Sequence, residues 1–318
     1  FFPFSMSAQS IVFETGHEEM IHDAQLDYYG KRLASASSDR TIKIFEVLGD
    51  KQNLVAHLKG HDGPVWQVNW AHPKFGVLLA SCSYDGKVCV WKEHQQNQWA
   101  KIFENVTSPH ASVNAVCWAP HTFGLVLAAA CSDGSVVIYT HQDDQSWSQD
   151  KINDAHVGGC NSVSWGPDVA AGGSLGGQVQ PVMTRFVTGG CDNKIKIWGL
   201  DRPQNGNPKW VERSNFQDEN KHNEWVRDVA WAPSLGLLSN TIASCSEDKT
   251  VIIWYEENGT WRRSKVLEFP HKIWRVSWSP MGNILAVSQG DNKVSLWKET
   301  VDGEWKNLST VEDEAKAE

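Results

Sequence analysis

Six times along this chain, an aspartate is followed at the sixth position after it by a large aromatic residue. The pairs are Asp39 and Phe45, Asp85 and Trp91, Asp133 and Tyr139, Asp192 and Trp198, Asp248 and Trp254, and Asp291 and Trp297. Successive aspartates lie 46, 48, 59, 56 and 43 positions apart, and apolar and polar residues alternate between each aspartate and its aromatic partner. Self-similarity at about 40–60 residues with strand-like alternation is typical of β-propeller blades. The sequence therefore predicts an all-β fold with six blades.

The second copy shows the expected plan of one blade. Residues 63–70 alternate toward a first strand, residues 78–83 form a second, residues 87–91 form a third, and a fourth begins at Trp99. Short turns and a polar hairpin separate these segments, which favours four antiparallel strands in chain order. The blades are expected near residues 17–58, 61–106, 110–153, 156–214, 222–269 and 271–311 of a single domain spanning residues 10–311. Residues 1–9 are expected to be disordered or foreign to the natural chain, and residues 312–318 to form an acidic tail.

All seventeen tryptophans fall at repeated positions. Most of them end the first or third strand of a copy or begin the fourth, and the first copy has Leu26 and Leu54 at two of these places. Trp66, Trp225 and Trp274 precede the end of a first strand by four or six residues. Because an indole can bury ~150–250 Å², we interpret the whole set as packing between blades.

A histidine, a hydroxyl residue, the repeated aspartate and a tryptophan recur together in three copies. They are His61, Ser81, Asp85 and Trp91, then His156, Thr188, Asp192 and Trp198, and finally His222, Ser244, Asp248 and Trp254. Such a set could form a nucleophilic catalytic site, but an enzyme needs one site, whereas here three copies are complete and the others are partial. The copies resemble WD repeats. This resemblance implies structural hydrogen-bond tetrads, which pair buried polar groups within each blade.

The composition argues against several other functions. A net charge of −9 disfavours direct binding of nucleic acid, which requires clustered Lys and Arg. The seven cysteines contain no C-x-x-C pair, so we interpret them as reduced thiols of a cytosolic or nuclear protein. The glycine-rich stretch at 170–178 precedes no helix and is interpreted as a surface loop rather than a phosphate site. No cofactor, metal or catalytic site is expected, and an enzyme is the least favoured class.

The number of strands exceeds what six blades can use. Residues 301–311 repeat the fourth-strand pattern in the last copy, so the six copies already supply all their strands. An apolar run at residues 10–14 adds one more strand before the first copy. We therefore predict an open propeller whose surplus strand belongs to a seventh blade that a partner completes by β-augmentation. The predicted partner-binding edge consists of Ile11, Val12, Phe13, Ile21, Ala24, Leu26 and Trp305. The alternative is that residues 301–311 are only a tail and that the N-terminal strand closes a six-bladed ring.

Long segments carry a more specific resemblance. Residues 16–47 (GHEEMIHDAQLDYYGKRLASASSDRTIKIFEV), 60–93 (GHDGPVWQVNWAHPKFGVLLASCSYDGKVCVWKE), 225–233 (WVRDVAWAP) and 290–299 (GDNKVSLWKE) resemble the Sec-thirteen family, which are small WD-repeat propellers of the COPII outer coat. The likeness extends from about residue 11 to residue 311. It implies a non-enzymatic scaffold that forms an open six-bladed propeller and that an α-solenoid coat subunit completes with an inserted blade.

The same resemblance implies where the protein works. It places the chain on the cytoplasmic face of the endoplasmic reticulum and on COPII vesicles in endoplasmic reticulum to Golgi transport, with the membrane contacted only through the coat. It also implies membership of the Y-shaped nuclear pore subcomplex, with a solenoid nucleoporin as partner, and of a nutrient-signalling complex upstream of TOR. Two alternatives stay open, namely a nucleoporin-only paralogue and a self-closed WD-repeat adaptor.

Overall fold

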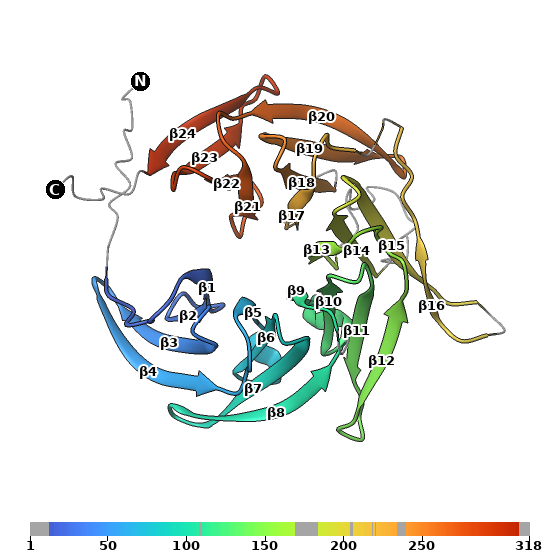
Figure 1. Cartoon of the computed structure of the whole chain (residues 1–318). Coiled ribbons are helices and arrows are strands. Elements are labelled where there is room, and N and C mark those ends of the chain that lie inside the picture. The colour runs from blue at the N-terminus through green and yellow to red at the C-terminus, as the bar shows by residue number, and fades with distance from the viewer. Residues whose placement is uncertain are drawn as a thin grey trace. The chain divides into compact units, whose positions relative to one another are not determined.

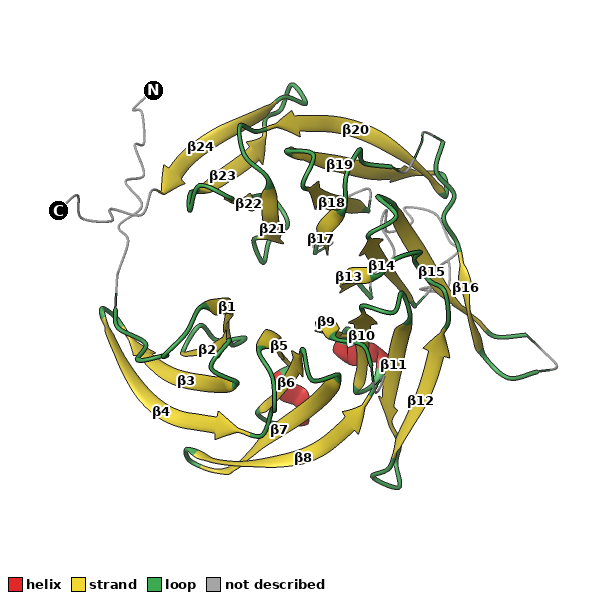
Figure 2. Cartoon of the chain, viewed as in Figure 1, coloured by secondary structure: helices red, strands yellow, loops and turns green. Residues whose placement is uncertain are grey.

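The computed structural model describes residues 13–107, 110–168, 184–203, 206–217, 219, 221–233 and 240–311. These residues form twenty-four strands in six four-stranded sheets, together with two short 3-10 helices (Figure 2). The all-β class and the six blades of a β-propeller are thus confirmed. In the part of the chain described, no helix is long and apolar enough to span a membrane.

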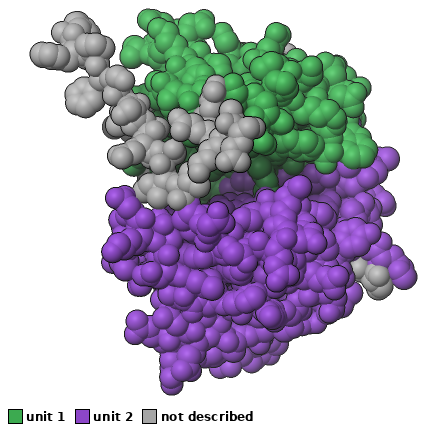
Figure 3. Space-filling view, turned by 60° about the vertical axis from the view of Figure 1, so that its left-hand side comes forward, with its two compact units in different colours: residues 1–12, 166–189, 193–318 green, residues 13–165, 190–192 purple. Residues whose placement is uncertain are grey.

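Two compact units make up the chain, and Figure 3 colours them separately. Unit 2 contains residues 13–165 and 190–192, and unit 1 contains residues 1–12, 166–189 and 193–318. A single domain over residues 10–311 therefore stays a prediction. The expected N-terminal segment 1–9, the glycine-rich loop 170–178 and the acidic tail 312–318 lie outside the described residues.

Unit 2 holds the first three sheets, whose strands follow one another in chain order. The first sheet consists of β1 (Ile21–Leu26), β2 (Arg32–Ser37), β3 (Thr41–Leu48) and β4 (Lys51–Lys59). The second consists of β5 (Val65–Trp70), β6 (Leu78–Ser83), β7 (Lys87–Gln95) and β8 (Gln98–Val106), with the 3-10 helix η1 (Pro73–Phe75) between β5 and β6. The third consists of β9 (Val113–Trp118), β10 (Val126–Cys131), β11 (Val136–His141) and β12 (Trp147–Ile152), with η2 (His121–Phe123) between β9 and β10. The first strands β1, β5 and β9 lie next to one another in turn (Figure 1).

The division between the units falls within the fourth sheet. This sheet consists of β13 (Cys160–Trp165), β14 (Arg185–Gly190), β15 (Ile195–Asp201) and β16 (Lys209–Glu212). Unit 1 also holds the fifth sheet, β17 (Val226–Trp231), β18 (Thr241–Ser246), β19 (Thr250–Glu257) and β20 (Thr260–Glu268). The sixth consists of β21 (Ile273–Trp278), β22 (Leu285–Gln289), β23 (Val294–Glu299) and β24 (Trp305–Val311). The last copy therefore has a fourth strand of its own.

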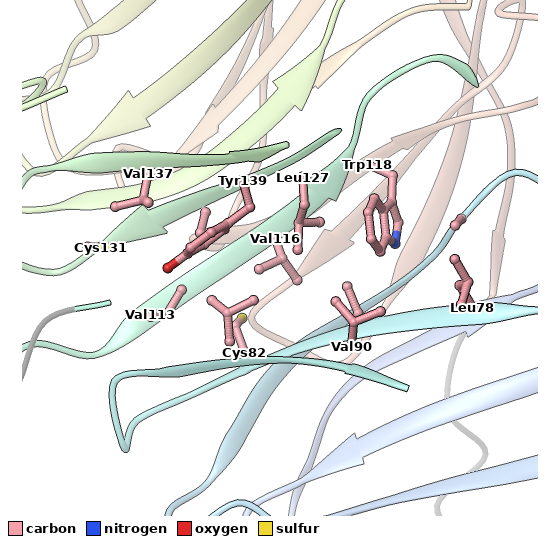
Figure 4. Packing of buried hydrophobic residues seen from close by; sticks show 14 residues of the cluster. Leu78, Cys82, Val90, Val113, Val116, Trp118, Leu127, Cys131, Val137 and Tyr139 are labelled. Atoms are coloured by element: carbon pink, nitrogen blue, oxygen red, sulfur yellow. The ribbon is translucent and has the colours of Figure 1, made fainter. Parts of the chain in front are cut away.

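Apolar side chains of neighbouring sheets interdigitate to form the core. Figure 4 shows Cys82 and Val90 of the second sheet facing Val116 and Leu127 of the third, and all four are almost completely buried. Trp118 closes one end of this cluster. Alternation along each strand sorts the side chains onto two faces, so a sheet can pack against a different neighbour on each face.

The turn after each second strand explains the repeated aspartate. The carboxylates of Asp39, Asp85, Asp133, Asp248 and Asp291 each accept a hydrogen bond from the backbone N–H two residues later, at 2.8 Å in the case of Asp85 and Lys87. The residue directly after the aspartate has positive φ in every copy: Arg40 67°, Gly86 78°, Gly134 85°, Asn193 67°, Lys249 68° and Asn292 63°. Gly and Asn tolerate this left-handed conformation best, which accounts for the DG and DN pairs of the sequence.

The register of the first sheet corrects one assignment. The fourth-strand tryptophan lies opposite the residue two positions after the repeated aromatic, as Trp99 lies opposite Glu93. The matching pair in the first sheet is Gln52 and Val47, whereas Leu54 lies opposite the repeated aromatic itself. Gln52 therefore stands where the other sheets have tryptophan. Hairpin length differs between copies, so a count along the sequence does not fix this register.

Candidate functional site

The predicted tetrad of the second sheet assembles around one hydroxyl. Ser81 Oγ lies 2.8 Å from His61 Nε2 and accepts a hydrogen bond from Trp91 Nε1 at 2.9 Å. On the other side of the imidazole, His61 Nδ1 lies 3.1 Å from Asp85 Oδ2. The fifth sheet repeats this arrangement with His222 Nε2 to Ser244 Oγ at 2.8 Å, Trp254 Nε1 to Ser244 Oγ at 3.0 Å and His222 Nδ1 to Asp248 Oδ2 at 3.0 Å. Each set forms one continuous chain of hydrogen bonds.

The fourth sheet contains the corresponding contacts. His156 Nδ1 lies 2.8 Å from Asp192 Oδ1, and Trp198 Nε1 donates to Thr188 Oγ1 at 2.9 Å. A glycine makes room for the imidazole, since a Cβ added at Gly190 would lie 2.4 Å from the His156 ring. Gly190 therefore serves the tetrad, because a larger residue there would collide with the imidazole.

The first sheet contains a chain of the same kind that the sequence analysis missed. His17 Nε2 lies 2.7 Å from Ser35 Oγ, and His17 Nδ1 lies 2.8 Å from Asp39 Oδ2. Phe45 stands in place of the tryptophan and has no N–H to donate. The signal that could have revealed it is the Gly-His pair at 16–17, which matches the pair at 60–61.

Electrostatics within the tetrads favour a fixed, charged acceptor. Burial disfavours the ionised form of Asp85, but hydrogen bonds from His61 and from the backbone N–H of Asp62 outweigh it and lower the pKa of Asp85 to about 2. Burial also opposes the charge of Asp248, yet its bonds to His222 and neighbouring groups hold its pKa well below the usual range. A carboxylate that orients a buried imidazole within a continuous chain of hydrogen bonds stabilises the blade.

One face of the first sheet is crossed by the segment that precedes β1. The ring of Phe13 meets Phe45 edge-on, with 5.3 Å between the ring centroids. Lys43 is buried beneath this segment, and its ammonium donates to the carbonyl oxygens of Thr15, at 3.3 Å, and of Gly16. Residues 13–16 are therefore held against the sheet by side-chain contacts.

The predicted N-terminal strand does not extend to these residues. Phe13 and Glu14 lie outside any strand. Phe13 contacts the first sheet through its side chain and forms no backbone ladder with it. Ile11 and Val12 lie outside the described residues. The surplus strand therefore stays a prediction for residues 10–12 and is wrong for residues 13–14.

β1 is the edge strand of the first sheet, and several of its side chains are exposed to solvent. Ile21, Ala24 and Leu26 are exposed, Leu26 to 56%. Leu26 lies opposite Leu33 on β2, which is partly exposed as well. The residues at the position of Leu33 in the other sheets are completely buried, namely Leu79, Leu127, Phe186, Ile242 and Leu285. The first sheet thus presents an apolar row that lacks the cover its counterparts have.

The sixth sheet presents a second uncovered face. Val294 and Leu296 lie three and one positions before the repeated aromatic, and Val294 is 38% exposed while Leu296 is partly exposed. Ala286, opposite Leu296, and Ser288, opposite Val294, are also partly exposed. In the other five sheets the residues at the positions of Val294 and Leu296 are at most 1% exposed: Ile42 and Ile44, Val88 and Val90, Val136 and Ile138, Ile195 and Ile197, and Val251 and Ile253.

Trp305 does not belong to this uncovered face. Its ring lies in the apolar cluster between the fifth and sixth sheets, 6.0 Å from the ring of Trp278, and is buried. Along a strand, successive side chains point to opposite faces, and Trp305 points to the covered one. Of the predicted partner-binding residues, Ile21, Ala24 and Leu26 are exposed and Trp305 is not. The residues that the sequence analysis missed are Val294 and Leu296.

The described residues contain no group of three or more His, Cys, Asp or Glu side chains arranged to hold a metal ion. Comparison with protein families gives five matches to the family described as "WD domain, G-beta repeat". They cover residues 9–46, 52–92, 103–140, 216–255 and 263–298.

Near-full-length relatives are found in fungi and in an amoeba. The chain is 51% identical to "Protein transport protein sec13" of Emericella nidulans, over 97% of this chain and 100% of the relative. It is 50% identical to "Protein transport protein SEC13" of Yarrowia lipolytica, over 93% and 98%. It is also 50% identical to "Protein SEC13 homolog" of Dictyostelium discoideum, over 96% and 99%.

Proposed function

The chain belongs to the Sec13 family of WD-repeat protein transport proteins, and from this premise we propose that it is a scaffold subunit of the COPII vesicle coat. Members of this family are structural proteins, and the chain is not an enzyme. The proposed role is in transport from the endoplasmic reticulum to the Golgi. It places the protein on the cytoplasmic face of the endoplasmic reticulum and on vesicles, with the membrane reached only through the coat.

The proposed mechanism is the acceptance of an inserted blade from an α-solenoid coat subunit. The observation that carries it is the apolar face of the sixth sheet, where Val294 is exposed and Leu296 is partly exposed although the same positions are buried in every other sheet. In a propeller such a face packs against a neighbouring blade, so strands supplied by a partner are its natural cover. A blade of that size would bury on the order of 2,000 Å² in total. The exposed row that includes Leu26 on the first sheet supports the same mechanism.

A matched pair of variants tests the proposal. Val294→Asp puts a charge on the uncovered face, and Val301→Asp puts the same charge in the fully exposed hairpin of the same sheet. With a co-expressed solenoid coat subunit, size-exclusion chromatography should show the complex for Val301→Asp and its loss for Val294→Asp. The partner should also raise the thermal midpoint of the unsubstituted chain, because it binds only the folded form. A Val294→Asp variant that forms the complex in full yield would refute the mechanism.

The same acceptor surface would serve two further assemblies. We propose that a solenoid nucleoporin of the Y-shaped nuclear pore subcomplex and a regulatory complex upstream of TOR bind it in the same way, each in competition with the coat subunit. Val294→Asp should then reduce capture of all three partners from cell extracts. Loss of the coat subunit alone would argue against a shared surface. A self-closed adaptor would capture none of them, and a nucleoporin-only paralogue would capture only the nucleoporin.

A further inference from the structure

Two tryptophans of unit 1 depart from the packing role expected of all seventeen. Trp225 is 46% exposed and Trp274 is 42% exposed. Trp225 directly precedes β17, and Trp274 is the second residue of β21, so both lie at the start of a first strand. Packing between blades therefore accounts for only part of the surface of these two indoles.

Arg227 holds the two indoles as a ladder. Its guanidinium carbon lies 5.2 Å from the ring centroid of Trp225 and 5.1 Å from that of Trp274. Arg227 also pairs with Glu247, and Glu247 pairs with Lys272. Stacking and ion pairing together fix the planar side chain, and with it the position of both rings. The two indoles are thus held in position without a bound ligand.

The indole N–H groups of this ladder are available to a ligand. Trp91, Trp198 and Trp254 donate their indole N–H to a hydroxyl oxygen within the blade. Trp225 and Trp274 donate to none of the described residues. An exposed aromatic face beside a free N–H donor suits a partner that offers apolar rings together with unpaired carbonyl oxygens.

We propose that Trp225, Arg227 and Trp274 form a docking surface for a proline-rich segment in the polyproline II conformation. The contacts of Arg227 place the two ring centroids at most about 10 Å apart. A polyproline II helix repeats every three residues, or about 9 Å. This repeat lies within the limit on the centroid separation, so prolines three positions apart can each contact one indole. Carbonyl oxygens of the segment, which has no internal hydrogen bonds, can then accept from the indole N–H groups.

Charge selects the residues that flank the prolines. Two cations, Arg227 and Lys272, share the single carboxylate of Glu247. The side chains that fix the two indoles thus contribute two cations and one carboxylate that is already paired, and these cations favour acidic side chains in the partner. The expected ligand is a proline-rich segment with acidic flanks, which distinguishes this surface from an aromatic cage for a cation.

Fluorescence anisotropy with labelled decaproline peptides tests the proposal on the full-length chain. One peptide carries two aspartates at each end and another carries two lysines. A third replaces the prolines with alternating glycine and serine between aspartates. The aspartate-flanked decaproline should bind most tightly, and Trp225→Ala and Trp274→Ala should each weaken it about tenfold or more. Tyr84→Ala, which removes an exposed aromatic side chain of unit 2, should leave binding unchanged.

Three results would overturn the proposal. These are no binding at about 1 mM peptide, equal binding by the tryptophan variants and the unsubstituted chain, and tighter binding of the lysine-flanked or the glycine-serine peptide. Trp225→Phe and Trp274→Phe keep an aromatic face but lose the N–H, so they separate loss of a hydrogen bond from loss of folding. Each should bind with an affinity between those of the alanine variant and the unsubstituted chain, and affinity as low as that of the alanine variants would contradict a role for stacking.

Discussion

Replacing Ser244 with alanine tests whether the tetrads act as structural circuits. Ser244 Oγ lies 2.8 Å from His222 Nε2 and accepts from Trp254 Nε1 at 3.0 Å. Trp254 is completely buried, so its N–H finds no water once the hydroxyl is gone. An orphaned buried donor costs about 1–3 kcal/mol, and loss of the bond to His222 costs about 0.5–1.5 kcal/mol more. Ser244→Ala should therefore destabilise the protein by about 2–4 kcal/mol.

The first sheet provides a matched control. Ser35 bonds His17 in the same way, but Phe45 has no N–H for Ser35 to accept. Ser35→Ala should therefore cost only about 0.5–1.5 kcal/mol, which leaves the difference between the two variants as the cost of one orphaned indole N–H. A Ser244→Ala, Trp254→Phe double variant removes donor and acceptor together, and the cycle should show a coupling of about 1–2 kcal/mol.

Urea unfolding followed by tryptophan fluorescence measures these changes, as shifts of the midpoint at constant slope. Equal midpoints for Ser244→Ala and Ser35→Ala, or a coupling of zero, would refute the reasoning, because the indole–hydroxyl bond would then contribute nothing. Ser244→Ala should also retain partner binding under conditions where it is folded. A variant that is fully stable yet inactive in complex formation would point to a direct role of the tetrad instead.

Three further predictions concern pH and the turns. The folded-state pKa of Asp85 is lowered to about 2 from an ordinary value of about 3.9, so its contribution to stability is present above about pH 4 and is lost as the pH falls toward 2. Near-ultraviolet circular dichroism should show a smaller acid-induced loss of tertiary signal for Asp85→Asn than for the unsubstituted chain, and an identical loss would contradict this assignment. Gly134→Ala should destabilise the protein by about 1–3 kcal/mol more than Gly259→Ala. Both residues have positive φ, but of the two only position 134 would place a Cβ against the backbone, 2.0 Å from the carbonyl oxygen of His156. Equal urea midpoints for the two variants would rule out this clash. Lys249→Gly should raise stability by about 0.5–1 kcal/mol by relieving the left-handed conformation at φ 68°, and a lowered thermal midpoint would count against it.

Much of the fold could be predicted because the local patterns and the tertiary fold agree. The second strand of the second copy, predicted at residues 78–83, is found at Leu78–Ser83, since its apolar run is bounded by clear turn residues. The misassigned Leu54 shows the limit of this approach. The residue that lies opposite Leu54 depends on the length of the hairpin between β3 and β4, which pair as far as Leu48 and Lys51. This length is set by how the two strands pair in three dimensions.

The tetrads were visible in the sequence only where all four members are present. The chain from His17 through Ser35 to Asp39 was missed because Phe45 replaces the fourth member. Trp305 was misplaced for a different reason. The sequence shows that it repeats a core position, but which face of the outer strand meets a neighbour depends on how the sheets pack.

The uncovered face of the sixth sheet could not be found from the sequence, and the reason bears on function. Val294 and Leu296 are the same kinds of residue as their fully buried counterparts Val251 and Ile253. Covering a partly exposed valine or leucine gains on the order of 1 kcal/mol, whereas leaving such a face in water invites non-specific association. A sheet whose working state was solvated would gain from polar residues there. The chain instead repeats its core pattern on this face, which is the pattern that the proposed cover of Val294 and Leu296 by an inserted blade requires.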